Sequence, residues 1–117
     1  MDIPILTDEL IFPPVTQTGP TGIVAIGGDV TPQRILLAYQ MGIFPWYEEN
    51  CPVYWHYPNP RFVLFPDKLR INKTVKSLIK KKCFEITVNQ SFSKVIENCK
   101  NLERTNQLGT WITNDLM

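Results

Sequence analysis

The sequence predicts an α+β fold in which short strands alternate with helices and a proline-rich turn separates two domains. Residues 23–26 are apolar at every position and precede two glycines, which is typical of a buried strand that ends in a tight turn. Apolar side chains recur at helical spacing in residues 32–41, 72–82 and 91–99. Between the last two of these segments, apolar and polar residues alternate at 84–88, which predicts a half-buried strand.

Length, composition and cysteine count restrict the class of protein. A chain of 117 residues has room for one domain, or for one small domain and part of another, and its 44% hydrophobic content argues against disorder. No apolar run approaches the roughly 20 residues of a membrane-spanning helix, and the N-terminus does not resemble a signal peptide. The three cysteines are far apart and have one histidine to accompany them, so we expect free thiols in the cytoplasm and neither a metal site nor a cofactor.

The first predicted domain covers residues 1–60. Its first 22 residues are rich in proline, threonine and glycine, and we expect an irregular lead-in with at most a short edge strand. Residues 45–66 combine aromatic side chains with five prolines, which exclude a long regular element there. The Pro-Asn-Pro sequence at 58–60 indicates a turn and is the best candidate for the domain boundary.

The helix expected at 32–41 has clear signals at both ends. Thr31 is suited to cap its first turn, and we expect the Asp29 carboxylate to accept backbone amides there. Gly42 is suited to the left-handed residue that ends a helix. The apolar positions form a broad face, and Arg34 is assigned outside it.

The second predicted domain covers residues 61–117. We expect a strand at 61–65, a helix capped by Asn72, the alternating strand at 84–88, and a helix capped by Ser91. This series ends just as new apolar residues appear, so it has the character of an unfinished fold. We therefore expect exposed apolar surface along the last helix.

A basic segment is the clearest candidate for chemistry. Seven lysines and arginines fall between positions 68 and 82, with no acidic residue among them. Lys73, Lys76 and Lys80 are spaced by three and four, so they share a helix face. Such a face attracts phosphates, and it is equally typical of a solvated surface whose lysines complement the helix dipole. The residues alone leave both interpretations open.

Two tryptophans have unusual neighbours: Trp46 follows a proline, and Trp111 follows a glycine–threonine pair. An exposed indole can stack on a nucleobase, which is worth about 1–3 kcal/mol per base. Without context, burial in the core is the more frequent fate of a tryptophan. His56 has no cysteine or acid at catalytic spacing, so we interpret it as a packing or hydrogen-bonding residue, and Glu48 and Glu49 as solvated.

Several of these segments, taken together, resemble successive motifs of the bacterial leucyl/phenylalanyl-tRNA–protein transferases. The resemblance extends from about residue 10 to the C-terminus and is specific, because the motifs recur in order. One departure is the Trp-His-Tyr sequence at 55–57, where family members usually have two tryptophans and a small residue. The motifs are GIVAIGGDVTP at 22–32, RILLAY at 34–39, GIFPW at 42–46, PNPR at 58–61 and GTWIT at 109–113.

The resemblance implies an enzyme that takes leucine or phenylalanine from its charged tRNA and joins it to an N-terminal lysine or arginine of an acceptor protein, which marks that protein for degradation. It implies a small N-terminal α+β domain followed by a GCN5-type (GNAT-like) acyltransferase domain. Trp46 and Trp111 would hold the terminal adenosine of the tRNA. The basic helix would meet the phosphates of the acceptor stem through Lys73, Lys76, Lys80 and Lys81.

The same resemblance assigns no catalytic residue to this chain. Family members are roughly twice as long, and the groups credited with activating the attacking amine lie beyond the Gly-Thr-Trp motif. We therefore expect the acyltransferase domain to be incomplete, because the chain is a truncated product or because a separate partner completes it, and we expect the chain alone to be inactive. The alternatives are a non-catalytic module that binds the acceptor end of tRNA and a structural remnant.

Overall fold

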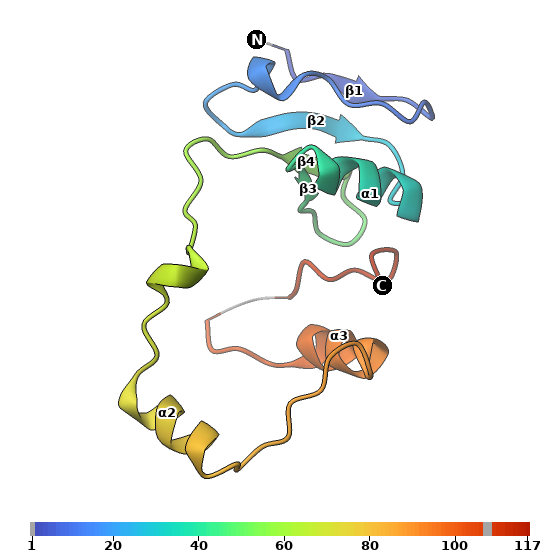
Figure 1. Cartoon of the computed structure of the whole chain (residues 1–117). Coiled ribbons are helices and arrows are strands. Elements are labelled where there is room, and N and C mark those ends of the chain that lie inside the picture. The colour runs from blue at the N-terminus through green and yellow to red at the C-terminus, as the bar shows by residue number, and fades with distance from the viewer. Residues whose placement is uncertain (1, 107–108) are drawn as a thin grey trace.

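The computed structural model describes residues 2–106 and 109–117 as a mixed α/β structure, with one four-stranded sheet and three α-helices (Figure 1). This confirms the mixed class expected from the sequence. No helix in the described part of the chain is long and apolar enough to cross a membrane. In chain order the elements are β1 (Ile5–Leu6), η1 (Val15–Gln17), β2 (Ile23–Gly27), α1 (Pro32–Gln40), β3 (Phe44–Pro45), β4 (Tyr54–His56), η2 (Pro66–Lys68), α2 (Lys73–Lys80) and α3 (Phe92–Asn101).

The sheet has the strand order β1-β2-β4-β3. β1 is a two-residue edge strand, which is within the limit of at most one short edge strand expected for the lead-in, and it pairs with β2 in parallel, with Ile5 opposite Ile26. β4 pairs antiparallel with both β2 and β3, so that Trp55 lies opposite Ala25 on one side and Pro45 on the other. Trp55 is thus at the centre of the sheet.

The turn between β2 and α1 forms as the sequence predicts. Gly27 and Gly28 both have left-handed backbone conformations, with φ of +83° and +74°. The Thr31 side chain accepts a hydrogen bond from the amide of Arg34, which caps the helix. At the other end, Gly42 has φ of +73° and redirects the chain into β3.

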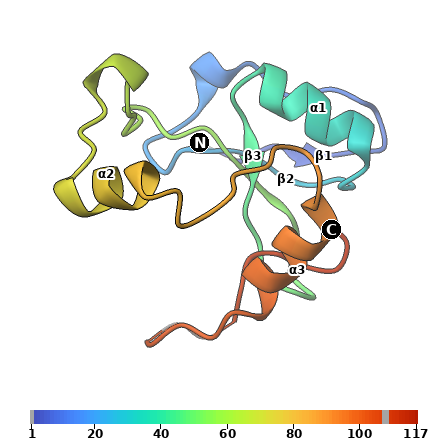
Figure 2. The same ribbon diagram turned by 60° about the horizontal axis from the view of Figure 1, so that its bottom comes forward.

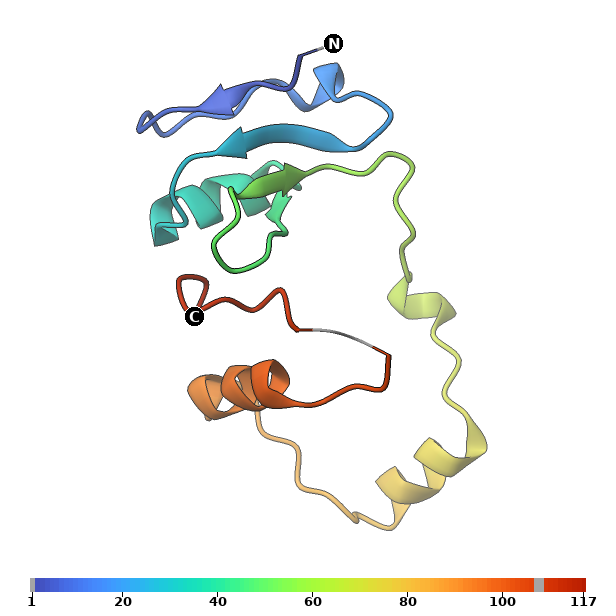
Figure 3. The ribbon, with the colours of Figure 1, turned by 180° about the vertical axis from the view of Figure 1, so that it is seen from behind.

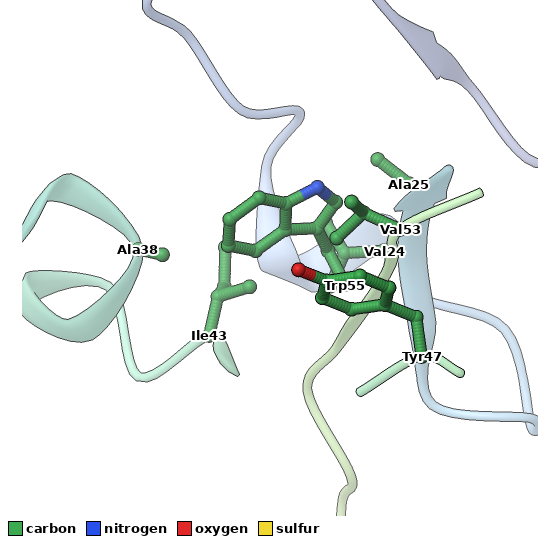
Figure 4. Packing of buried hydrophobic residues seen from close by; sticks show 7 residues of the cluster. All are labelled: Val24, Ala25, Ala38, Ile43, Tyr47, Val53 and Trp55. Atoms are coloured by element: carbon green, nitrogen blue, oxygen red, sulfur yellow. The ribbon is translucent and has the colours of Figure 1, made fainter. Parts of the chain in front are cut away.

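The core is centred on the indole of Trp55, which is fully buried. Its Nε1 donates a hydrogen bond of 2.9 Å to the Gly27 carbonyl oxygen, so the polar atom of the ring is satisfied inside the core. Figure 4 shows the ring with Ala38 and Ile43 on one side and Val24 on the other. The buried apolar cluster consists of Val24, Ala25, Ala38, Ile43, Tyr47, Val53 and Trp55.

Arg34 corrects the prediction that placed it outside the buried face of α1, because its exposed fraction is 0%. Its guanidinium donates to the carbonyl oxygens of Glu9 and Thr7 at 3.1 and 3.0 Å, and to the Asp29 carboxylate at 3.1 and 3.3 Å. A buried charge is tolerated when it is paired and hydrogen-bonded, and these contacts pair the charge and use four of the five N–H donors of the guanidinium. Arg34 therefore ties the helix to the lead-in and to the preceding turn.

The second half corrects two further predictions. Neither 61–65 nor 84–88, both within the described residues, forms a strand. Their apolar side chains are exposed; Ile86, for example, is 83% exposed. A strand needs a neighbour that accepts its backbone hydrogen bonds and covers its apolar face, and no described segment lies alongside these two as a strand. Alternation in the sequence was not sufficient to form a sheet.

Helices α2 and α3 form where the sequence predicts them, with different starts. The Asn72 side chain accepts a 2.8 Å hydrogen bond from the Val75 amide and caps α2 as expected. Ser91 makes no side-chain cap hydrogen bond, so its predicted capping role is wrong. On α3, Phe92 and Val95 are exposed, as expected for that helix.

The chain has an open shape. Figures 1 and 3 show it leaving the sheet through η2 and α2, turning back through α3, and returning with its C-terminal segment between the sheet and α3. Figures 1 and 3 show α2 well away from the sheet, and Figure 2 shows α2 on the opposite side of the view from α1. The radius of gyration is 17.9 Å, whereas a compact chain of this length has about 13 Å. Of the segments that follow the sheet in the chain, the C-terminal one returns to lie beside it.

Candidate functional site

Trp46 and Trp111 line the same open pocket, although they are far apart in the sequence. The pocket has a volume of about 510 Å³. Trp46 is 58% exposed and Trp111 is 43% exposed, so the burial favoured by composition alone is wrong for both. The pocket is lined by Trp46, Glu48, Glu49, Lys100, Gly109, Thr110, Trp111, Ile112 and Thr113.

The first wall of the pocket follows β3. Successive side chains of an extended segment point to opposite sides. Here Pro45 and Tyr47 are buried and Trp46 between them is exposed. The Trp46 amide donates a 2.9 Å hydrogen bond to the Tyr54 carbonyl oxygen, which keeps this residue attached to β4 after the strand has ended. The rigid sheet therefore presents the indole toward the pocket.

The second wall is the C-terminal segment that begins at Gly109. Trp111 is exposed and the two residues after it, Ile112 and Thr113, are buried. The Thr113 hydroxyl and the Tyr47 hydroxyl form a buried hydrogen bond of 2.9 Å. This hydrogen bond joins the two walls directly. Tyr47 is one residue after Trp46, and Thr113 is two residues after Trp111.

The charge of the pocket comes from three side chains. Lys100, in the last turn of α3, contributes a cation, and its ammonium donates to the Asn114 side-chain oxygen. The Asn114 amide in turn donates to Glu49 at 3.2 Å, and Glu48 lies on the same pocket. Lys100 was missed in the sequence because it stands outside the basic run. The signal in the sequence that could have identified Lys100 was its position near the end of the predicted helix that precedes the Gly-Thr-Trp motif.

The predicted lysines lie elsewhere. Lys73, Lys76 and Lys80 belong to α2 and Lys81 follows it; all four are exposed. Among the described residues that line the pocket, none comes from α2. The two tryptophans thus line one pocket, and helix α2, which carries the lysines, lies at the opposite end of the molecule from the sheet (Figure 1).

A second aromatic group adjoins the first wall. The His56 ring stacks on Phe44 with centroids 5.8 Å apart and lies 6.3 Å from the Trp46 ring. Partial burial lowers the pKa of His56, which favours the neutral imidazole and agrees with the packing role expected for it. The Arg61 guanidinium lies 5.6 Å from the Phe44 ring centre and donates to the Gly42 carbonyl oxygen at 2.7 Å.

Comparison with known proteins gives two family matches. Residues 63–117 match the family described as leucyl/phenylalanyl-tRNA protein transferase, and residues 28–59 match its N-terminal domain. Together these matches cover most of the chain.

Individual relatives agree with the family matches. Proteins named leucyl/phenylalanyl-tRNA–protein transferase from Flavobacterium johnsoniae and Lawsonia intracellularis are 46% and 48% identical over 112 and 109 residues. The alignments cover 96% and 93% of this chain, and 53% and 48% of the relatives. The protein of that name from Myxococcus xanthus is 44% identical over 119 residues, which is 100% of this chain and 51% of the relative. The chain thus spans about half the length of the curated relatives it matches.

Proposed function

Because the chain belongs to the leucyl/phenylalanyl-tRNA–protein transferase family, we propose that it forms the part of an aminoacyltransferase that binds the acceptor end of an aminoacyl-tRNA. The whole protein would transfer leucine or phenylalanine from that tRNA to the N-terminal lysine or arginine of an acceptor protein. Such tagging in the cytoplasm would mark the acceptor for degradation.

The pocket between the two indoles carries this proposal. Trp46 and Trp111 both line it and are both partly exposed, so a planar base has a ring to stack on at each wall. The terminal adenosine is the proposed occupant, with Lys100 close enough to meet its phosphate. Stacking would supply about 1–3 kcal/mol per base.

The lysine face of α2 supports a partner larger than one nucleotide. Lys73, Lys76, Lys80 and Lys81 are exposed and lie away from the pocket, so they suit phosphates of the acceptor stem at some distance from the terminal adenosine. Contacts of this kind release counterions, and the affinity they provide falls as salt concentration rises.

The proposed reaction is an aminolysis. The α-amine of the acceptor attacks the ester carbonyl of the aminoacyl-tRNA, a peptide bond forms, and the ribose hydroxyl of the terminal adenosine leaves with the proton that the amine gives up. The ester is already activated, so holding the two reactants in place provides much of the acceleration. Trp46 and Trp111 would bind and orient the ester, and no residue of this chain is assigned a proton-transfer role.

We also propose that residues 61–117 begin a GNAT-like acyltransferase domain that follows an N-terminal domain of residues 1–60. The interval between the two family matches, at 60–62, supports this boundary. So does the change from a buried sheet before it to exposed helices after it.

Titration of the chain into a short, fluorescently labelled acceptor-stem RNA that ends in a 3′-adenosine tests the binding proposal through the fluorescence anisotropy of the RNA, a readout that does not depend on the tryptophans. We expect Trp46→Ala and Trp111→Ala each to weaken binding by about 5- to 100-fold, and Trp46→Phe to retain part of the affinity. Unchanged affinity in the double alanine variant would refute the pocket as the binding site.

The salt dependence of the same titration tests the lysine face. Replacing Lys73, Lys80 and Lys81 with glutamine should reduce the slope of log affinity against log salt by about 0.7–0.9 for each phosphate that is no longer neutralised. Binding that ignores salt and survives these substitutions would favour a solvated helix face and a structural remnant.

A transfer assay separates an enzyme from a binding module. Labelled leucine on tRNA is incubated with the chain and a peptide that begins with lysine or arginine. We expect the isolated chain to bind the RNA and to transfer nothing. Transfer above the rate without protein would show that the catalytic groups lie within residues 1–117.

A further inference from the structure

The two walls of the pocket are joined by one buried side-chain hydrogen bond. The Tyr47 and Thr113 hydroxyl oxygens are 2.9 Å apart, and both residues are more than nine-tenths buried. The Thr113 oxygen also accepts a hydrogen bond from the Leu116 amide at 3.3 Å, so it helps to shape the C-terminal segment as well. A buried hydroxyl that loses its partner is costly, and this favours the paired arrangement.

This hydrogen bond lies next to the two residues that would hold the ligand. Tyr47 directly follows Trp46, and Thr113 is two residues after Trp111. One residue spans at most about 3.6 Å of chain, so fixing Tyr47 and Thr113 leaves little freedom in the separation of the two tryptophan backbones. A second side-chain hydrogen bond between the walls, from Asn114 to Glu49, is exposed, so water competes for both of its groups.

We propose that Tyr47 and Thr113 act as a positioning pair that sets the separation of the Trp46 and Trp111 indoles for a stacked adenine nucleotide. This inference rests on the proposed function of the pocket. Tyr47 does not line the pocket, and Thr113, which does, is buried with its hydroxyl bonded to Tyr47 and to the Leu116 amide, so both are proposed to act through the tryptophans. Without this hydrogen bond the C-terminal segment moves more freely. It then loses more conformational entropy when a base is bound between the two walls, and the affinity falls.

Adenosine 5′-monophosphate is the probe, and tryptophan fluorescence of the full chain is the readout. Tyr47→Phe and Thr113→Val each remove one hydroxyl with little change in shape, and we expect each to weaken binding by about threefold to tenfold. Because both remove the same bond, the double variant should be no weaker than either single one. Thr113→Ser keeps the hydroxyl and should bind adenosine 5′-monophosphate with the affinity of the wild-type chain.

Tyr39→Phe is the matched control, because Tyr39 is an exposed tyrosine on α1 away from the pocket, and its substitution should leave binding unchanged. Amide hydrogen exchange of Thr113 and Leu116 provides a readout that needs no ligand. We expect faster exchange at both amides in Tyr47→Phe and Thr113→Val, and unchanged exchange in Tyr39→Phe.

The outcomes separate the two proposals. If the unchanged chain does not bind the nucleotide, the proposed function of the pocket fails, and the positioning pair is then judged by amide exchange alone. If it binds and both hydroxyl variants bind equally well with unchanged exchange, the positioning role is overturned. If Tyr47→Phe does not fold, the comparison of Thr113→Val with Thr113→Ser still tests the inference. Equal affinities of these two variants for adenosine 5′-monophosphate would contradict it.

Discussion

At the scale of single residues, the pair formed by Arg34 and Asp29 joins α1 to the irregular lead-in and to the turn after β2. Arg34 donates to backbone carbonyl oxygens of the lead-in and to the Asp29 carboxylate. Asp29 also accepts from the amide and hydroxyl of Thr31, at 3.1 and 2.7 Å. Hydrogen bonds from Arg34 and then from Thr31 lower the pKa of Asp29 from 3.8 to about 2.

This shift predicts the pH dependence of an Asp29→Asn variant. Because the pKa is lower in the folded chain, ionised Asp29 stabilises the fold fully above pH 3.8, and this contribution is lost as the pH falls toward 2. We expect the variant to be less stable than the unchanged chain at pH 7 and the difference to shrink between pH 4 and pH 2. Urea unfolding at several pH values measures it. A difference that stays constant with pH would contradict the prediction.

Lys100 is the residue for which a ligand contact is most sharply testable. Its ammonium has three donors and gives one to Asn114, so it can still bind a phosphate of a nucleotide in the pocket. We expect the unchanged chain to bind adenosine 5′-monophosphate more tightly than adenosine, and Lys100→Gln to bind both with similar affinity.

Lys94→Gln is the control for Lys100→Gln, because Lys94 belongs to the same helix and does not line the pocket. It should keep the preference for the phosphorylated ligand. Fluorescence titration with both ligands gives the two affinity ratios. An equal loss of preference in both variants would indicate a general effect of net charge, and would remove Lys100 from the site.

Sequence reasoning predicted part of this chemistry, and the reason for the division is physical. The proline before Trp46 and the glycine two residues before Trp111 marked places where the chain bends and an indole can stay exposed. The burial of Arg34 depends on carbonyl oxygens from a distant segment, and periodicity within the helix carries no information about them. The contact of Lys100 with Asn114 depends likewise on how the C-terminal segment returns.

At the scale of elements, local signals predicted all three α-helices in the described part of the chain, whereas of the strands predicted at 23–26, 61–65 and 84–88 only the first forms, as β2. Thr31 and Asn72 each satisfy an amide in the first turn of the helix that follows, so these helix starts are encoded within a few residues. A strand depends on a neighbour that is distant in sequence. Residues 61–65 and 84–88 have suitable side chains and no such neighbour among the described residues, so they remain irregular.

Helix α2 should therefore depend on its cap. It has eight residues, none of them buried, and isolated helices of that length are marginal in water. Asn72→Ala removes a cap worth about 0.5–2 kcal/mol, so we expect faster amide exchange at Val75 and Lys76. Exchange at Val24, in the sheet, should not change. Asn72→Asp keeps an acceptor oxygen, so its α2 amides should exchange as slowly as those of the original sequence. If Asn72→Ala speeds amide exchange in the sheet as much as in α2, this account is contradicted.

At the scale of the whole molecule, burial is distributed unevenly. Most buried apolar side chains cluster around Trp55 in and beside the sheet, and Ile112 of the C-terminal segment is buried outside that cluster. Residues 61–102 expose large apolar side chains along their whole length. Stability measured by global unfolding should accordingly report on the sheet, and the intervening helices should open at much lower free energy.

Two identical substitutions test this distribution. Val24→Ala removes two methyl groups from the core and should lower the free energy of unfolding by about 1.5–2.5 kcal/mol. Val88→Ala removes the same groups from a side chain that is 73% exposed, and should change the free energy of unfolding by less than about 0.5 kcal/mol. Urea unfolding followed by far-ultraviolet circular dichroism gives both values. Equal losses would mean that residues near Val88 pack in solution against apolar surface that the open chain leaves uncovered.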